Sequence, residues 1–191
     1  MSLNIAILAS GSGSNAENII QYFSESEKFI FPLIISNKLN AYVHERAKKL
    51  QIPSVTFSKE DFLDGNKVLD CLKEYEIDCI VLAGFLLKIP QVLIDAFPNK
   101  IINIHPALLP KYGGKGMYGH FVHEAVAASG DHESGITIHY VNGNYDEGNI
   151  IFQAKCPVLS TDTPDIIAEK VHELEYAYFP KVIEELWGKE F

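Results

Sequence analysis

Two polar side chains stand two positions apart in a segment suited to acyl-transfer chemistry. Asn103 and His105 end an apolar run and precede Pro106. Residues i and i+2 of a strand point to the same side, so the amide and the imidazole would face one way. Acyl transfer develops an oxyanion that an Asn N–H and a protonated His can both hold. The residues alone leave open a second interpretation, in which Asn103 caps a turn and His105 lies on the surface.

A later carboxylate is a candidate partner for this histidine. Asp146 lies in a polar segment and is followed by Glu147 and Gly148. A carboxylate close to His105 would favour the imidazolium and raise the pKa of His105, as a catalytic acid near neutral pH requires. An Asp beside a Gly is also a common turn former. Both interpretations stand, because the sequence does not show how close the two side chains lie.

A run of small residues near the N-terminus has the composition of an anion site. Residues 10–15 read Ser-Gly-Ser-Gly-Ser-Asn, between the first apolar run and a segment of helical period. Small residues at a strand-to-helix junction let backbone amides and hydroxyls approach an anion. The spacing matches neither the dinucleotide fingerprint nor the NTP-binding P-loop, which favours a single phosphate. An ordinary strand-to-helix turn is the alternative.

The other titratable groups give weaker indications. His172 and Glu175 are three apart on one helical face, and a solvated surface would explain them. His120 and His123 are expected to cap a helix or face solvent. The histidines other than His105 and His172 form no metal-ligand pattern with carboxylates or thiols. They are His44, His120, His123, His132 and His139.

Nothing in the sequence indicates a covalent intermediate. The chain has no Gly-x-Ser-x-Gly elbow, and its three cysteines, Cys71, Cys79 and Cys156, lack CxxC spacing. Cys79 lies in an apolar run and Cys156 precedes a proline, so neither resembles an activated nucleophile. We therefore expect direct, metal-free transfer in a reduced, cytoplasmic protein.

An α/β fold must position these residues. Short apolar runs at residues 5–9, 29–35, 54–57 and 79–83 alternate with segments of helical period that begin near residues 15, 42 and 66. Such alternation predicts βαβ units. Runs that are apolar on both faces suit the central strands of a covered parallel sheet. We predict a doubly wound, mostly parallel central sheet with a Rossmann-like N-terminal half.

The C-terminal part is expected to differ. Two extended segments, residues 135–141 and 149–157, are joined by a turn-rich stretch and predict antiparallel strands. Thr163 as N-cap and Pro164 at the first helical position predict a closing helix that packs on the sheet. Asn103 and His105 fall at the carboxyl end of a predicted strand at residues 100–104, where open α/β sheets bind ligands.

Composition limits the classes of partner. A chain of 191 residues with 47% hydrophobic residues predicts one domain over residues 1–191. The formal charge of −9, without a basic block, argues against nucleic acid as a partner. No run approaches the roughly 18 apolar residues of a membrane span, so no membrane partner is expected. The sequence does not reveal an oligomeric state.

Taken together, five segments in chain order resemble the glycinamide ribonucleotide formyltransferase family over almost the whole chain. They are residues 9–15, 35–38, 81–85, 103–106 and 146–151. The Asn-x-His-Pro segment and the later Asp are shared by folate-dependent formyltransferases, whereas the Gly-Ser-Gly-Ser-Asn loop and the chain length point to the purine-synthesis enzymes. The resemblance implies a ribonucleotide phosphate-binding half at about residues 1–100 and a catalytic and folate-binding half at about 101–191.

The resemblance also implies an activity. The amine of 5-phosphoribosylglycinamide would attack the formyl carbon of 10-formyltetrahydrofolate, its co-substrate, in de novo purine (IMP) synthesis, without a metal or an acyl-enzyme. By matching position, Asn103 would hold the formyl oxygen. His105 would stabilise the oxyanion as imidazolium and relay the proton, and Asp146 would keep His105 charged.

Binding positions follow from the same resemblance. Gly13, Ser14 and Asn15 match the positions that hold the ribonucleotide phosphate, and His172 and Glu175 fall where the family completes that pocket. The folate would contact Asn103 and the segment whose backbone receives the pterin, which comprises Leu86, Leu87, Lys88 and Ile89.

Two departures concern the loop and the folate contacts. Ala107 stands where the family commonly has Ser, and Gly113 where it commonly has Pro, followed by the unusual residues 115–118. Leu87 and Lys88 stand where an Arg is frequent. The catalytic residues themselves are intact.

The residues are also compatible with three other functions. A folate-dependent formyltransferase acting on an initiator aminoacyl-tRNA or an amino sugar would share the catalytic segment, but the tRNA enzymes carry a further domain and a basic surface. A formyltetrahydrofolate hydrolase would normally add a regulatory domain. A catalytically silent nucleotide-binding module would leave Asn103, His105 and Asp146 apart in space, so their convergence is the discriminating observation.

Overall fold

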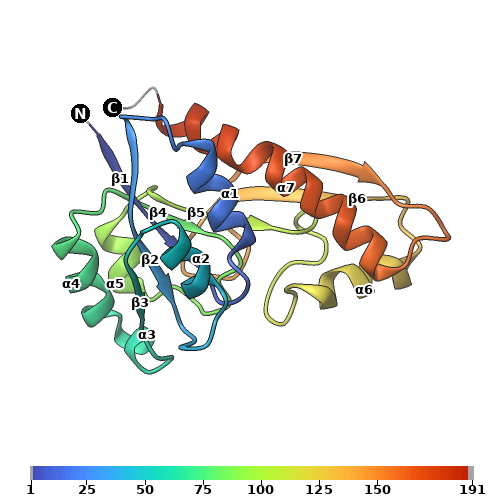
Figure 1. The fold of residues 1–191 in the computed structure, drawn as a ribbon. Coiled ribbons are helices and arrows are strands. Elements are labelled where there is room, and N and C mark those ends of the chain that lie inside the picture. Colours follow the sequence, from blue (N-terminus) through green and yellow to red (C-terminus); the bar gives the residue numbers. More distant parts are fainter. Residues whose placement is uncertain (1, 189–191) are drawn as a thin grey trace.

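A mixed sheet forms the centre of the protein (Figure 1). The computed structural model describes residues 2–188; residue 1 and residues 189–191, which the predicted domain includes, lie outside the described residues. Within residues 2–188 seven strands form one sheet in the order β3-β2-β1-β4-β5-β6-β7. The strands are β1 (Leu3–Leu8), β2 (Phe29–Ser36), β3 (Ser54–Thr56), β4 (Cys79–Leu82), β5 (Ile101–His105), β6 (Glu133–Tyr140) and β7 (Ile150–Pro157).

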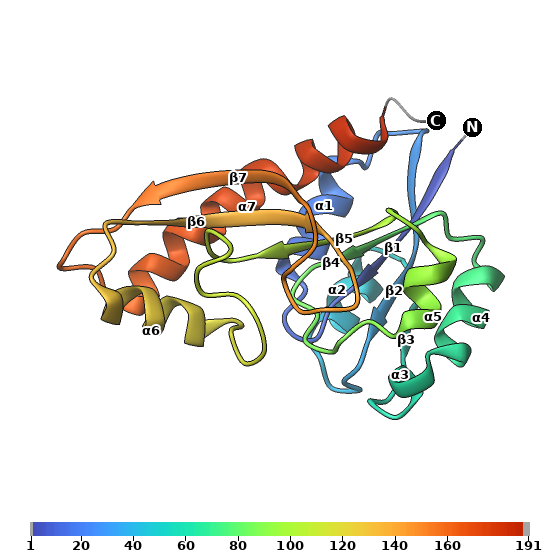
Figure 2. The ribbon, with the colours of Figure 1, turned by 180° about the vertical axis from the view of Figure 1, so that it is seen from behind.

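Helices cover both faces of the sheet (Figures 1 and 2). Along β1 the side chains alternate, because Ile5 and Ile7 belong to one buried cluster and Ala6 and Leu8 to another. The first cluster includes residues of α1, α2, α6 and α7, and the second includes residues of α3, α4 and α5. The helices are α1 (Ser14–Tyr22), α2 (Val43–Lys49), α3 (Asp61–Asp64), α4 (Asn66–Glu74), α5 (Gln91–Ala96), α6 (His120–Ser129) and α7 (Pro164–Trp187).

The sheet changes direction after β5. Strands β1 to β5 pair in parallel, whereas β6 runs antiparallel to β5 and β7 antiparallel to β6. Asn103 pairs with His139 in register, and His105 pairs with Thr137. The doubly wound, mostly parallel sheet with an antiparallel C-terminal part is therefore confirmed. The antiparallel addition brings β6 side chains beside the polar end of β5.

The closing helix begins where the sequence predicts. The Thr163 hydroxyl accepts a hydrogen bond from the Ile166 N–H at 3.3 Å, and Pro164 is the first helical residue. Ile167, Val171 and Val182 are buried in the cluster on this face of the sheet. The helix is 24 residues long, yet within residues 2–188 no helix is both long and apolar enough to cross a membrane.

The predicted boundaries differ from the observed ones by one or two residues, as helix and strand ends usually do. The predicted strand at residues 100–104, for example, is β5 at Ile101–His105. The predicted alternation omits α3 and α5, which have four and six residues. Helices this short show too little of the 3.6-residue period to be recognised in a single sequence.

We predict that Gly135→Ala destabilises the antiparallel part of the sheet. A Cβ at Gly135 would lie 1.9 Å from the carbonyl oxygen of Ala154 on β7, so the strands would have to separate. The free energy of unfolding should fall by about 1–3 kcal/mol in urea denaturation. Gly143→Ala is the matched control, because its Cβ would meet only the end of the Gln91 side chain, at 3.4 Å. Equal stabilities of the two variants would contradict the close approach of β6 and β7.

Candidate active site

A cleft of about 620 Å³ opens at the carboxyl ends of the parallel strands. Its walls come from the loop after β1, the segment after β4, the end of β5, the connection from β5 to α6, α6 itself, the connection from β6 to β7, and α7. Among its lining residues are the sequence-predicted Gly13, Ser14, Asn15, Leu86, Asn103, His105, Asp146, His172 and Glu175.

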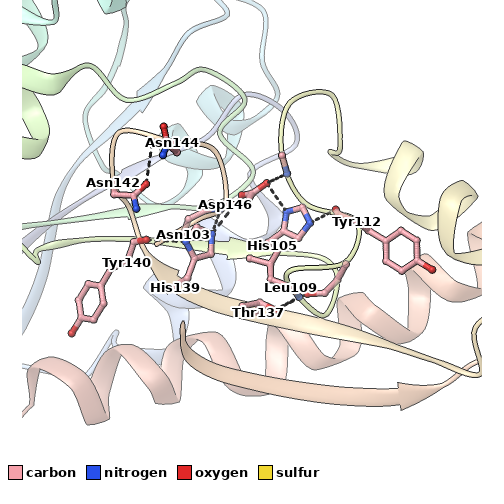
Figure 3. Close-up of polar contacts among 12 residues, drawn as sticks. Asn103, His105, Leu109, Tyr112, Thr137, His139, Tyr140, Asn142, Asn144 and Asp146 are labelled. Carbon is pink, nitrogen blue, oxygen red and sulfur yellow. Dashed lines mark hydrogen bonds and ion pairs between the residues drawn. The ribbon is translucent and has the colours of Figure 1, made fainter. Parts of the chain in front are cut away.

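Asn103 and His105 both line this cleft (Figure 3). Asn103 is half-buried, and His105 is only 3% exposed. The interpretation of His105 as a surface residue is therefore wrong. Their two-residue spacing on β5 gives them a common side, as strand alternation predicts.

Asp146 approaches His105 from the connection between β6 and β7. Its Oδ2 lies 3.5 Å from His105 Nδ1 and accepts a hydrogen bond from the Gly114 N–H at 3.0 Å. The residue also has a left-handed backbone with φ 56°. Asp146 therefore combines the two roles that the sequence left as alternatives, since it shapes a turn and places a carboxylate beside the histidine.

The hydrogen bonds of His105 fix where its protons lie. Nε2 is 2.7 Å from the Tyr112 carbonyl oxygen, and a carbonyl only accepts, so Nε2 carries a hydrogen. The other ring nitrogen faces the Asp146 carboxylate. Each nitrogen therefore faces an acceptor, which suits the doubly protonated ring.

Burial opposes that charge. It lowers the pKa of His105 below its ordinary value, although the Asp146 carboxylate and the Tyr112 carbonyl act to raise it. Asp146 thus acts to raise the pKa of His105, as the sequence predicts, but burial lowers that pKa by more. In the protein without substrates, the imidazolium becomes abundant only below the ordinary pKa of histidine.

His139 completes a chain of polar contacts that no pattern in the sequence predicted (Figure 3). Its Nδ1 donates to the Tyr140 carbonyl at 2.9 Å. Its Nε2 lies 3.1 Å from Asn103 Nδ2 and 3.5 Å from Asp146 Oδ1. Nε2 therefore accepts from Asn103 when the ring is neutral and faces Asp146 with a proton when it is charged. The chain runs Asn103, His139, Asp146, His105, so the three predicted catalytic side chains converge through a fourth.

The neighbouring histidines and backbone N–H stabilise the ionised form of Asp146. Burial would raise the pKa of Asp146, but the contact with His139, the nearby His105 and the Gly114 N–H together lower it below its ordinary value. A carboxylate in this position is ionised at neutral pH. It is the fixed negative charge of the polar cluster, which comprises Asn103, His105, His139 and Asp146.

The loop after β1 has the geometry of a helix entrance. Gly13 precedes α1 with φ 73°, and a Cβ there would lie 2.4 Å from Val43 Cγ2 of α2. The Val43 N–H donates to the Gly11 carbonyl at 3.1 Å, and Arg46 Nε donates to the Ser12 carbonyl at 2.9 Å. These bonds engage carbonyls of the loop on the α2 side, while the loop itself lines the cleft.

Glu175 of α7 lies close to this helix entrance. Its Oε2 accepts hydrogen bonds from Asn15 Nδ2 and from His172 Nδ1, both at 2.8 Å. Glu175 is only 8% exposed, so the interpretation of this pair as a solvated helical face is wrong for Glu175. The side chain of His172 is 43% exposed and lies at the edge of the cleft.

His123 contradicts a further expectation. It is 7% exposed, lines the cleft from α6, and its Nδ1 is buried without a hydrogen-bond partner among the described residues. Burial lowers the pKa of His123, partly offset by Glu175. The expected solvent-facing or capping role is therefore wrong for His123. His120 does lie on the surface, with Nε2 3.3 Å from Glu124.

The segment predicted to receive the pterin divides between two cavities. Leu86 lines the main cleft, and Leu87, Lys88 and Ile89 line a smaller cavity of about 60 Å³. Asn103, Tyr145 and Asp146 belong to both linings, so the cavities adjoin at the polar cluster. The Leu86 N–H is already engaged, because it donates to Ser10 Oγ at 2.9 Å.

A buried threonine supports the backbone after His105 (Figure 3). Thr137 Oγ1 donates to the Ala107 carbonyl at 2.7 Å and accepts from the Leu109 N–H at 3.0 Å. Gln153 Nε2 of β7 donates to the same hydroxyl at 2.9 Å. The turn that leaves β5 is thus held by β6 and β7.

No cluster of three or more His, Cys, Asp or Glu side chains that could hold a metal ion occurs in the described part of the chain, residues 2–188. The polar cluster alternates donors and acceptors around one carboxylate. Such an arrangement can hold an oxyanion and move a proton.

Known proteins are similar to this chain in sequence and in fold. Residues 3–183 match the family described as formyl transferase. The chain is 40% identical over 185 residues to phosphoribosylglycinamide formyltransferase, chloroplastic, of Arabidopsis thaliana, covering 94% of this chain but only 63% of that protein. It is 35% identical to phosphoribosylglycinamide formyltransferase of Bacillus subtilis over 96% of this chain and 94% of that one. The crystal structure of the protein of the same name from Anaplasma phagocytophilum superposes with a TM-score of 0.90, at 31% identity, covering 99% of this chain and 88% of that one.

We predict that Thr137→Val weakens the turn after His105. Valine keeps the shape but leaves the buried Leu109 N–H without its acceptor and the Ala107 carbonyl without its donor. The free energy of unfolding should fall by about 1–3 kcal/mol in urea denaturation. Thr137→Ser retains the hydroxyl and should recover most of the loss. A valine variant as stable as the wild type would show that these bonds do not hold the turn.

Proposed function

Because the chain belongs to the formyl transferase family, we propose that it transfers the formyl group of 10-formyltetrahydrofolate to the amine of 5-phosphoribosylglycinamide, in de novo purine synthesis. The convergence of Asn103, His105 and Asp146 at one cleft is the observation that carries the proposal. The same cleft includes the loop at the start of α1, which suits a single phosphate. Relatives at 35–40% identity bear the name of this activity.

The proposed reaction forms one bond and breaks another. The amine nitrogen attacks the formyl carbon, and the formyl oxygen takes up the negative charge of a tetrahedral intermediate. The carbon–N10 bond of the folate then breaks, N10 gains a proton, and the attacking amine loses one. The products are formylated glycinamide ribonucleotide and tetrahydrofolate.

Asn103 and His105 would hold the developing charge. One N–H of the Asn103 amide faces His139, which leaves its second N–H for the formyl oxygen. The imidazolium of His105 would donate a second hydrogen bond and relay the proton from the amine toward N10. Oriented donors in a buried site stabilise such a charge more than water does.

His105 must change partner to do this. Its Nε2–H donates to the Tyr112 carbonyl at 2.7 Å, and its Nδ1 faces Asp146. We infer that the formyl oxygen takes the place of the Tyr112 carbonyl as acceptor from Nε2. Asp146 would meanwhile hold the proton on Nδ1, so that the ring stays charged when Nε2 meets the oxyanion.

The ribonucleotide would lie along α1 and α7. Its phosphate would meet the backbone of Gly13, Ser14 and Asn15 at the start of α1. Glu175, held by Asn15 and His172, would face the sugar hydroxyls, for which a carboxylate is a strong acceptor. We place the pterin at the backbone of residues 86–89, beside the polar cluster.

We propose one domain whose halves differ in function rather than in folding. Strands β4 and β5 pair across residue 100, so the sheet is continuous there. In this proposal residues 1–100 supply the backbone loop of the phosphate site, and residues 101–191 supply the catalytic groups and part of the folate site. The partners are small molecules, and a cytoplasmic location remains a prediction; the Arabidopsis relative is named chloroplastic.

The first test is the reaction itself. Purified protein with 10-formyltetrahydrofolate and 5-phosphoribosylglycinamide should yield a product heavier by one formyl group, with the absorbance change of the released folate. His105→Ala should lower turnover by about 100-fold or more, because it removes the proton relay. A folded protein that binds the folate but formylates another amine would contradict the proposal that 5-phosphoribosylglycinamide is the acceptor. One that does not bind folate would indicate the silent binding module.

We also predict that Asp146→Asn separates turnover from binding. The asparagine removes the charge that raises the pKa of His105, so the imidazolium becomes scarcer at neutral pH. Turnover should fall by about 100-fold or more, while KM for the ribonucleotide changes by less than about threefold. The alkaline limb of the pH–rate profile should move to lower pH. Unchanged turnover across the profile would exclude this role.

A further inference from the structure

The charges around the cleft do not match an anionic substrate unless one lysine takes part. Two carboxylates, Asp146 and Glu175, line the cleft, and Lys115 is the only Lys or Arg among its described lining residues. A phosphate dianion between two carboxylates is unfavourable without a cation nearby. Arg46 does not supply it, because Arg46 forms an ion pair with Glu17 and donates to the Ser12 carbonyl.

Lys115 lines the cleft without a polar partner among the described residues. It is exposed, and within residues 2–188 no hydrogen bond or ion pair involves its side chain. Its neighbours Gly114 and Gly116 have φ of 93° and 90°, and a Cβ at either would meet nothing within 4 Å. The segment is therefore unpacked on both sides of the lysine, and its glycines allow backbone changes that other residues resist.

One end of this segment is held at the polar cluster. The Gly114 N–H donates to Asp146 Oδ2 at 3.0 Å. The backbone next to Lys115 is therefore fixed relative to the catalytic carboxylate. The connection from β5 to α6 lies beside the loop before α1 in both views (Figures 1 and 2). Both segments line the same cleft. A lysine side chain on this connection can thus reach toward the start of α1.

We propose that Lys115 binds the phosphate of the ribonucleotide substrate from the side opposite the loop of residues 11–15. The loop supplies backbone N–H groups and the α1 dipole, and Lys115 supplies a full positive charge that no other Lys or Arg of the described lining can supply. This inference rests on the proposed function for the identity of the substrate. The folate carboxylates are the competing anions, but Lys115 does not line the smaller cavity, which is lined by Lys88 of the predicted pterin segment.

The test compares acceptors with and without the phosphate. Lys115→Met removes the charge and keeps much of the length, and it should lower kcat/KM for 5-phosphoribosylglycinamide by roughly tenfold to a hundredfold, mainly through KM. With the dephosphorylated nucleoside as acceptor, the same variant should match the wild type within about twofold. Lys115→Arg should recover most of the loss. Lys73→Met, an exposed lysine on α4 outside both cavities, is the charge-matched control and should leave both values unchanged.

Three outcomes would overturn the inference. An equal loss with both acceptors would show that Lys115 acts on the chemistry or the fold rather than on the phosphate. A rise in KM confined to the folate would place Lys115 at the folate carboxylates. Unchanged kinetics would show that the lysine is not used.

A direct binding measurement separates this inference from the proposed function. Inorganic phosphate titrated into the protein and followed by ³¹P NMR should bind Lys115→Met at least about tenfold more weakly than the wild type. That difference would persist if the wild type failed to formylate the expected acceptor, which would reject the proposed function alone. Equal phosphate affinity in an enzyme that does transfer the formyl group would reject Lys115 alone.

Discussion

The partly buried carboxylate of Asp146 is the charge on which the arrangement of the cleft depends. A carboxylate removed from water is strongly destabilising unless donors surround it. Here the His105 ring of β5 and the Gly114 N–H of the connection to α6 face it. Nε2 of His139 on β6 lies 3.5 Å from Asp146 Oδ1 and is a donor to it when that ring is charged. One ionised group thereby links three segments of the chain. The pKa of Asp146 is lowered, because these contacts outweigh the effect of burial.

The sheet makes this arrangement possible. Parallel strands end at one edge, so the loop after β1 and the polar end of β5 meet there. The antiparallel strand β6 then brings His139 opposite Asn103 and Thr137 opposite His105. His139 extends the polar cluster, and Thr137 holds the turn that follows it. The catalytic side chains are therefore positioned by a neighbouring strand as much as by their own.

Much of this could be predicted from local patterns. Apolar runs predicted the central strands, and Thr163 with Pro164 predicted the start of α7, because strand alternation and helix capping depend on adjacent residues. The Asn-x-His pattern indicated a common side on one strand. The convergence of Asp146 with His105 could only be hypothesised, since it depends on where a loop 41 positions later folds back.

The remainder depends on contacts between distant segments. The role of His139 follows from the register between β5 and β6, which no local pattern encodes. Glu175 and His123 look like surface residues because helical periodicity does not distinguish a polar side chain facing a cleft from one facing solvent. The lowered pKa of His105 could not be predicted either. The sequence indicates a nearby carboxylate, which raises that pKa, but not the burial that lowers it by more.

The most direct test of the central role of Asp146 is a ¹⁵N NMR titration of the His105 ring, in the wild type and in Asp146→Asn. We predict that His105 takes up its second proton below the ordinary pKa of histidine in the wild type, and at a still lower pH in the variant. A wild-type pKa at or above the ordinary value, or one that the variant leaves unmoved or raises, would contradict this prediction.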